Sequence, residues 1–156
     1  MFDSHSHSIS FTTLEMADRK HTSTLLHGIQ ILFIDDDYVN FLYFNELLGG
    51  SGSEVMRAVS VSQAIYKLKY ENAIRVVFMS AEFAERFNYS ILRFFKDRFP
   101  DLPIITIIDD QSSKAQKRCI EEGSDCYIHR HIDNNHLVEL IMDNITSDQI
   151  NSYANH

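Results

Sequence analysis

Three consecutive aspartates follow directly on four apolar residues in the segment ILFIDDDYVN, residues 31–40. Neighbouring carboxylates repel one another, so such a cluster is unusual unless something cationic lies beside it. The apolar run shows no polar alternation, which indicates a strand covered on both faces, as in a parallel sheet. Ligand sites in such sheets lie beyond the carboxyl ends of the strands. Asp35, Asp36 and Asp37 are therefore candidates for a functional site.

Further polar residues follow the later apolar runs of the chain. Ser80 ends the run at residues 74–80, and Asp109 and Asp110 follow the run at residues 103–108. Parallel strands end at a common edge, so we expect these side chains to lie near the aspartates of the first strand. The late carboxylates would crowd the same edge and could retain weak cation binding.

The remaining pattern predicts strands that alternate with helices along the chain. We expect strands over residues 31–35, 54–59, 74–80, 103–108 and 125–129. We expect helices over residues 38–48, 61–70, 85–98, 112–122 and 133–145, with Asp133 as the N-cap of the last. This order predicts an α/β fold with a parallel sheet and helices on both faces.

The ends of the chain lack this regular pattern. Residues 1–28 are rich in Ser, Thr and His and are expected to form a flexible leader, with a short helix near TLEMADRK. One domain is expected over residues 29–146, followed by a tail over residues 147–156.

Composition narrows the classes of partner. The formal net charge of −8 disfavours binding to the phosphate backbone of nucleic acid. No apolar run approaches the roughly 20 residues that span a bilayer, and the first residues do not resemble a secretory signal. Cys119 and Cys126 are the only cysteines, which fits reduced thiols. We therefore expect a cytoplasmic protein whose partners are proteins or a cation.

Three segments carry motifs that occur together in one family. ILFIDDD ends in an acidic pair at Asp35 and Asp36, and FPDLPIITII places a proline before an apolar strand. CIEEGSDCYIHRH is similar to the pattern A-G-A-D-D-Y-L-x-K-P, with the matching residues Gly123, Asp125, Tyr127 and Ile128. Together these segments resemble the receiver domain of bacterial response regulators, a chemotaxis-type domain with the flavodoxin-like fold. The resemblance implies a five-stranded parallel sheet of order 2-1-3-4-5.

Several positions depart from the pattern of that family. Receivers of this kind accept a phosphoryl group on an aspartate at the end of the third strand, beside a divalent ion held by the acidic pair. The resemblance places Ser80 at the acceptor position, and a serine hydroxyl is a poor nucleophile without a neighbouring base. Ile108 stands where the family has Thr or Ser, and Arg130 stands where it has lysine. Tyr127 matches the switch aromatic of the family, but the hydroxyl partner of that aromatic is absent.

These departures suggest a degenerate acidic pocket at Asp35, Asp36 and Asp109. We expect Arg130 to pair with Asp35 or Asp36 in place of the ion, so that magnesium binding at these two aspartates is weak if it occurs. No other cofactor is expected.

The resemblance implies a receiver-type protein in two-component phosphorelay signalling. The departures favour a pseudo-receiver that acts without phosphorylation and without enzymatic activity. Its signalling partner is expected on residues 112–145, and a homodimer is possible. The sequence predicts no contact with nucleic acid or membrane.

An enzymatic alternative remains open. DDDYV also fits the D-x-D-x-T/V motif of haloacid-dehalogenase-type phosphatases, with Asp35 as nucleophile and Asp37 as acid. That superfamily places a Ser or Thr on the core strand that follows the nucleophile. Against this alternative, Ser80 lies on the third strand of this chain. Lys96 also lies late in its helix, whereas that superfamily needs a lysine at a helix start.

The aromatic residues of FLYFNELL are expected to pack on the sheet. Phe41, Tyr43 and Phe44 fall within the helix predicted after the aspartates. We interpret them as helix faces buried against the strands rather than as a cofactor site.

Overall fold

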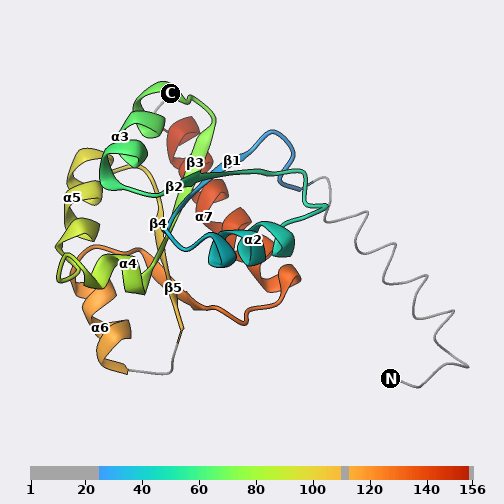
Figure 1. Ribbon diagram of the computed structural model, residues 1–156. Coiled ribbons are helices and arrows are strands. Elements are labelled where there is room, and N and C mark those ends of the chain that lie inside the picture. The colour runs from blue at the N-terminus through green and yellow to red at the C-terminus, as the bar shows by residue number, and fades with distance from the viewer. Residues whose placement is uncertain (1–24, 110–112, 155–156) are drawn as a thin grey trace, which may run out of the picture.

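Five parallel strands form the centre of the protein (Figure 1). The structure is a computed structural model, and it describes residues 25–109 and 113–154. The strands are β1 (Gln30–Ile34), β2 (Glu54–Ala58), β3 (Ile74–Ser80), β4 (Ile104–Ile108) and β5 (Cys126–His129). Their order is β2-β1-β3-β4-β5 and all four pairings are parallel, which confirms the predicted flavodoxin-like sheet.

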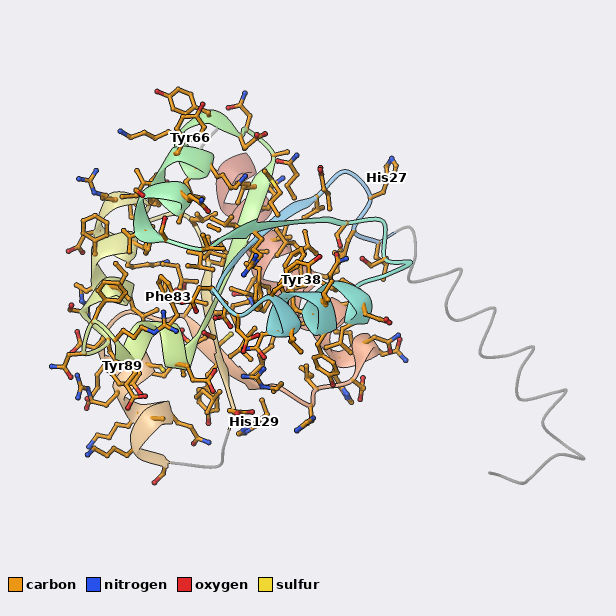
Figure 2. The ribbon with its side chains drawn as sticks, in the orientation of Figure 1. His27, Tyr38, Tyr66, Phe83, Tyr89 and His129 are labelled. Carbon is orange, nitrogen blue, oxygen red and sulfur yellow. The ribbon has the colours of Figure 1, made fainter. Side chains whose placement is uncertain are left out.

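Helices cover both faces of the sheet (Figure 1). One face carries α3 (Val61–Tyr70), α4 (Ala81–Glu85), α5 (Ser90–Arg98) and α6 (Ser113–Glu121). The other face carries α2 (Tyr38–Leu47) and α7 (Asn134–Ala154). Tyr38 at the start of α2 and Phe83 within α4 mark these two sides in Figure 2. Each face has its own buried cluster, so the inner strands β1, β3 and β4 are mostly apolar and buried, as expected for a parallel sheet.

Two helices, α4 and α5, lie where one helix was expected over residues 85–98, and α4 overlaps that range only at Glu85. The shorter one, α4, begins directly after β3, because the hydroxyl of Ser80 accepts a hydrogen bond from the Phe83 N–H at 3.1 Å. The chain then turns through Asn88 and Tyr89, whose φ angles are 51° and 66°, before α5 begins. Asn tolerates this left-handed conformation better than most residues, whereas a bulky aromatic rarely adopts it. Apolar periodicity carries no signal for such a turn.

The folded domain begins earlier than predicted. Leu26 is fully buried, and its N–H donates to the Ser51 carbonyl at 3.1 Å. Residues 25–28 therefore belong to the domain, although the sequence placed them in the leader. Residues 1–24, including the predicted short helix, lie outside the described residues.

The last helix starts where the sequence predicts and ends later. Asp133 caps α7 as expected, since its carboxylate accepts from the His136 N–H at 2.9 Å. The helix continues to Ala154 instead of ending at residue 145. It therefore includes most of the segment that was assigned to a tail.

Candidate functional site

The carboxyl ends of β1, β3 and β4 meet at one edge of the sheet. Ile34 pairs with Met79, and Ser80 pairs with Ile107. Asp35 follows β1 directly, and Ile108 is the last residue of β4. The prediction that Ser80 lies at the same edge as Asp35 is confirmed, and Ile108 ends β4 at that edge.

The first aspartate of the cluster is buried. Asp35 is 2% exposed, and its Oδ1 accepts from the Asp37 N–H at 3.1 Å. Its Oδ2 accepts from the side-chain amide of Asn40 at 2.9 Å. A buried carboxylate needs such donors, because removal from water without them is costly.

The second aspartate is held by an arginine. Asp36 accepts two hydrogen bonds from Arg86, at 2.6 and 2.9 Å, in a forked pair. The guanidinium of Arg86 holds the pKa of the Asp36 carboxyl below its ordinary value. The backbone carbonyl of Asp36 accepts from Arg57 at 2.7 Å. Arg86 is therefore the cation that the run of three aspartates led us to expect beside them.

The third aspartate begins the next helix. Asp37 is the N-cap of α2, and its Oδ1 accepts from the Val39 N–H at 2.9 Å. This bond satisfies a backbone donor that has no partner inside the helix. The run of three aspartates thus combines a buried acceptor, an ion-paired acceptor and a helix cap.

Arg130 has partners other than those predicted. Its Nε donates to Asp109 at 2.7 Å, and its Nη2 donates to Glu82 at 3.1 Å. Its Nη1 donates to the side-chain oxygen of Asn40. The prediction that Arg130 pairs with Asp35 or Asp36 is wrong, because Asn40 lies between Arg130 and the buried Asp35 and hydrogen-bonds to both.

Glu82 lies in the first turn of α4. Burial raises the pKa of its carboxyl, and Asp109 and Asp35 act in the same direction. The nearby positive charge of Arg130 acts against this shift. Arg130 therefore neutralises two carboxylates at this edge, of which the sequence indicated Asp109 but not Glu82.

Ser80, which the sequence predicts at the acceptor position, has a structural partner. Its side chain is almost completely buried, and its Oγ caps α4 by accepting from Phe83. Within the described residues, no carboxylate or imidazole is hydrogen-bonded to this hydroxyl. The geometry therefore provides no base that would activate Ser80 as a nucleophile.

The two residues predicted at the switch positions of the family, Ile108 and Tyr127, also make structural contacts. Ile108 is 1% exposed and belongs to the apolar cluster beneath α4 and α6. Tyr127 is half-buried, and its hydroxyl donates to Gln116 of α6 at 3.2 Å. Asp110, which the sequence placed at the same edge, lies outside the described residues.

The donor set at this edge does not fit the magnesium ion of the receiver family. Mg²⁺ requires several oxygen ligands in near-octahedral geometry. Here Asp36 is neutralised by Arg86, Asp35 already accepts two hydrogen bonds, and Ser80 is uncharged. Among residues 25–109 and 113–154, no group of three or more His, Cys, Asp or Glu side chains is arranged to hold a metal ion.

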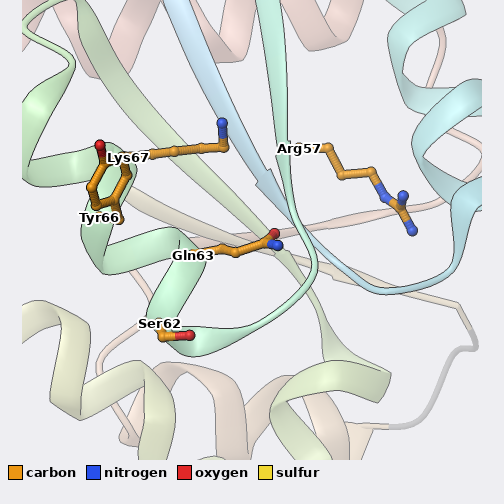
Figure 3. A pocket seen from close by; sticks show the side chains of 5 residues that line it. All are labelled: Arg57, Ser62, Gln63, Tyr66 and Lys67. Atoms are coloured by element: carbon orange, nitrogen blue, oxygen red, sulfur yellow. The ribbon is translucent and has the colours of Figure 1, made fainter.

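Two hollows lie on the surface of the protein, and one of them adjoins Asp109 and Glu82 of the site. One, of about 430 Å³, lies between α4 and α6 and has acids and bases on its walls, including Glu85, Asp109, Lys114 and Arg118. The other, of about 400 Å³, is lined by Arg57, Ser62, Gln63, Tyr66 and Lys67. In Figure 3 the Arg57 side chain points away from Lys67 and Gln63, so these polar groups do not converge on one ligand position.

The sequence did not indicate the importance of Arg86 or Asn40. Arg86 was placed near the start of a long helix, whereas it caps α4 and reaches Asp36 from 50 residues away. The sequence contains one weak indication of Asn40: it is a polar residue on the sheet side of an otherwise apolar helix segment.

Comparisons with solved structures agree with the receiver fold. NtrX from Brucella abortus superposes with a TM-score of 0.68 at 19% identity, over 81% of this chain and 28% of that chain. A response regulator from Thermotoga maritima gives 0.66 at 20% identity, over 76% of this chain and 98% of that one. A CheY-like receiver domain protein from Methanospirillum hungatei gives 0.63 at 18% identity, over 79% and 98%.

These similarities identify the fold of the chain as that of CheY-like response regulator receiver domains. No protein-family model matches the sequence, and neither does any curated protein. The match covers less than a third of the NtrX chain but nearly all of the Thermotoga maritima and Methanospirillum hungatei chains. In the described parts of the chain, no helix is both long enough and apolar enough to cross a bilayer.

Proposed function

We propose that this chain is a pseudo-receiver: a receiver-type protein of bacterial two-component signalling that acts by binding a protein partner, independently of phosphorylation. The observation that carries the proposal is the state of Ser80. The family resemblance predicts it at the acceptor position, and in the structure it is buried and uses its oxygen to cap α4. A neutral hydroxyl in that role is not a phosphoryl acceptor.

The pairing of the surrounding charges supports the same proposal. Arg86 holds Asp36, and Arg130 holds Asp109 and Glu82. A phosphoryl group at this edge would need a divalent ion and a free cation to balance its charge. Both arginines are already engaged with carboxylates of the chain itself.

The phosphatase alternative is less well supported. Asp37 would have to protonate a leaving group, but its carboxylate caps α2 and accepts from the Val39 N–H. Asp35 would have to attack a phosphate ester, but it is 2% exposed. Nothing in this geometry favours an enzymatic role, and we propose that the chain is not an enzyme and carries no cofactor.

We propose that the partner binds residues 112–145, which comprise α6, β5 and the first half of α7. In the described part of that surface, Ile120 is the exposed large apolar residue, at 45%. The surrounding surface is polar, which suits a reversible signalling contact. With a net charge of −8, we expect a cytoplasmic protein partner rather than nucleic acid or membrane.

The test is intact-mass measurement after incubation with acetyl phosphate and magnesium. We expect no added phosphoryl group on the native protein, and none after Ser80→Ala. A phosphoryl adduct on the native protein that hydroxylamine removes would show an acyl phosphate and would contradict the proposal. Hydrolysis of a small phosphate ester that Asp35→Asn abolishes would favour the phosphatase instead.

A further inference from the structure

One helix of the protein exposes several large apolar side chains together. Tyr38 is 55% exposed, Val39 71%, Leu42 45% and Tyr43 42%. At 3.6 residues per turn these four residues fall within about 140° of the helix circumference. We call this set the outer α2 stripe. Contiguous exposed apolar residues of this kind mark interaction surfaces more often than isolated ones do.

The opposite side of the same helix is fully used by the fold. Phe44 is 3% exposed, and its ring lies 4.8 Å from that of Phe33 and 4.7 Å from that of Phe78. The helix is therefore apolar on both sides, although only one side is covered. A helix that is apolar all round normally has both sides buried. Within the described residues, no other part of the chain covers the outer α2 stripe.

The two ends of the stripe differ in charge. Glu46 is the only charged residue of α2 and lies near its carboxyl end. At the amino end, the guanidinium of Arg57 lies 5.1 Å from the centre of the Tyr38 ring. The middle of the stripe, around Leu42, is uncharged.

We propose that the outer α2 stripe is the interface of a two-fold dimer, in which α2 packs antiparallel against α2 of a second copy of this chain. A two-fold axis near Leu42 places Tyr38 of one copy opposite Glu46 of the other, since each lies four residues from Leu42. Glu46 then approaches Arg57 beside that Tyr38. A two-fold interface requires a self-complementary surface of this kind.

The distribution of charge along the stripe favours a second copy of the chain as the occupant. Two chains with a net charge of −8 repel one another, so they can associate only where the contact surface is neutral or its charges are complementary. The stripe meets both conditions when the helices run antiparallel, and the helix dipoles then also oppose one another favourably. A parallel arrangement would bring Glu46 against Glu46.

The size of the stripe predicts a weak dimer. Large apolar and aromatic side chains have areas of roughly 150–250 Å² each, so the exposed fractions amount to about 400 Å² per copy. That total is below the size of most stable interfaces, so we expect a dissociation constant on the order of 10–100 µM. The inference rests on the interaction role proposed above and names one partner for it. It leaves residues 112–145 free for a signalling protein.

The test is sedimentation equilibrium of the full chain over about 1 to 500 µM, with matched charge substitutions. Leu42→Glu should raise the dissociation constant of the dimer at least about tenfold, because the charge is buried twice at the two-fold axis. Ile120→Glu is the control, since Ile120 has the same 45% exposure but lies on α6. It should leave the dimer unchanged.

A charge swap tests the antiparallel arrangement. Glu46→Arg should weaken the dimer by placing like charges together, and adding Arg57→Glu should restore it. If the double variant has the melting temperature of the native protein but does not regain its dimerisation, the antiparallel arrangement is wrong.

A native protein that stays monomeric at 500 µM would overturn the proposal, even if a different protein were then found on α2. Equal dimerisation of the Leu42→Glu and Ile120→Glu variants would do the same. These outcomes are distinguishable from failure of the proposed function, which is decided by the phosphoryl adduct and not by oligomeric state.

Discussion

The three aspartates after β1 and the outer α2 stripe are adjacent in the sequence but differ in how the fold treats them. Each aspartate has donors within the chain: Asn40 for Asp35, Arg86 for Asp36, and the first turn of α2 for Asp37. The residues of the stripe, which begins at Tyr38, face solvent. The three aspartates thus have partners within the chain, whereas the outer side of α2 has no packing partner among the described residues.

This difference shows why residue type alone is a weak guide to a binding site. Like charges in a row suggest an external cation, but arginines and amides from distant segments can replace it. A run of apolar residues suggests a core helix, but only half of its circumference can contact the sheet. The binding surface is the one whose interactions the fold leaves incomplete.

The largest expected effect separates the two sides of α2. Phe44→Ala should lower the free energy of unfolding by about 3–5 kcal/mol, because it leaves a cavity between Phe33 and Phe78. Val39→Ala, on the outer side, should change it by less than about 0.5 kcal/mol. Urea unfolding at a few micromolar, where the dimer is dissociated, measures both. Similar losses for the two variants would mean that the stripe is covered within the monomer.

A smaller effect is expected at the amide that joins Asp35 to Arg130. Asn40→Ala removes one donor from the buried carboxylate and one acceptor from the arginine, so we expect a loss of about 1–3 kcal/mol in unfolding free energy. Asn45→Ala is the control, because Asn45 is exposed on the same helix. Denaturant unfolding that gives equal stability for both variants would show that Asp35 is satisfied by water.

The smallest effect concerns the exposed pair of Asp36 and Arg86. The folded protein lowers the pKa of Asp36, so the pair stabilises the fold above the unfolded value of 3.8. This stabilisation is lost as the pH falls through the lower, folded pKa. Arg86→Ala should raise the pKa of Asp36 towards 3.8 and reduce the acid-side dependence of stability. NMR titration of the carboxyl carbons measures the shift, and Arg98→Ala should leave Asp36 unchanged.

Much of the fold could be predicted because its signals are local. The continuous apolar runs of β1 and β4 identified parallel strands, and Asp133 identified the start of α7. Strand order followed from the family resemblance. The edge shared by Asp35 and Ser80 followed from the topology, since parallel strands end together.

The pairings at that edge could not be predicted, because they depend on side-chain reach across distant segments. Arg86 and Asp36 are 50 residues apart, and Arg130 and Asn40 are 90 apart. The turn at Asn88 and Tyr89, which follows Arg86, also has no periodic signal in the sequence. Of the aromatic residues expected on the sheet, Phe44 is buried there, but Tyr43 is 42% exposed. When a helix has two apolar faces, the sequence alone does not show which face is buried against the sheet.

The central claim is that the charges at the end of β1 are balanced from within the chain. Magnesium titration of the native protein, followed by NMR at Asp35 and Asp36, tests it most directly, with the Arg86→Ala, Ser80→Asp double variant as the comparison. We expect no saturable shifts in the native protein up to about 10 mM Mg²⁺, and saturable binding in the variant, which frees one carboxylate and adds another. Saturable binding by the native protein below about 1 mM, with shifts centred on Asp35 and Asp36, would contradict the claim.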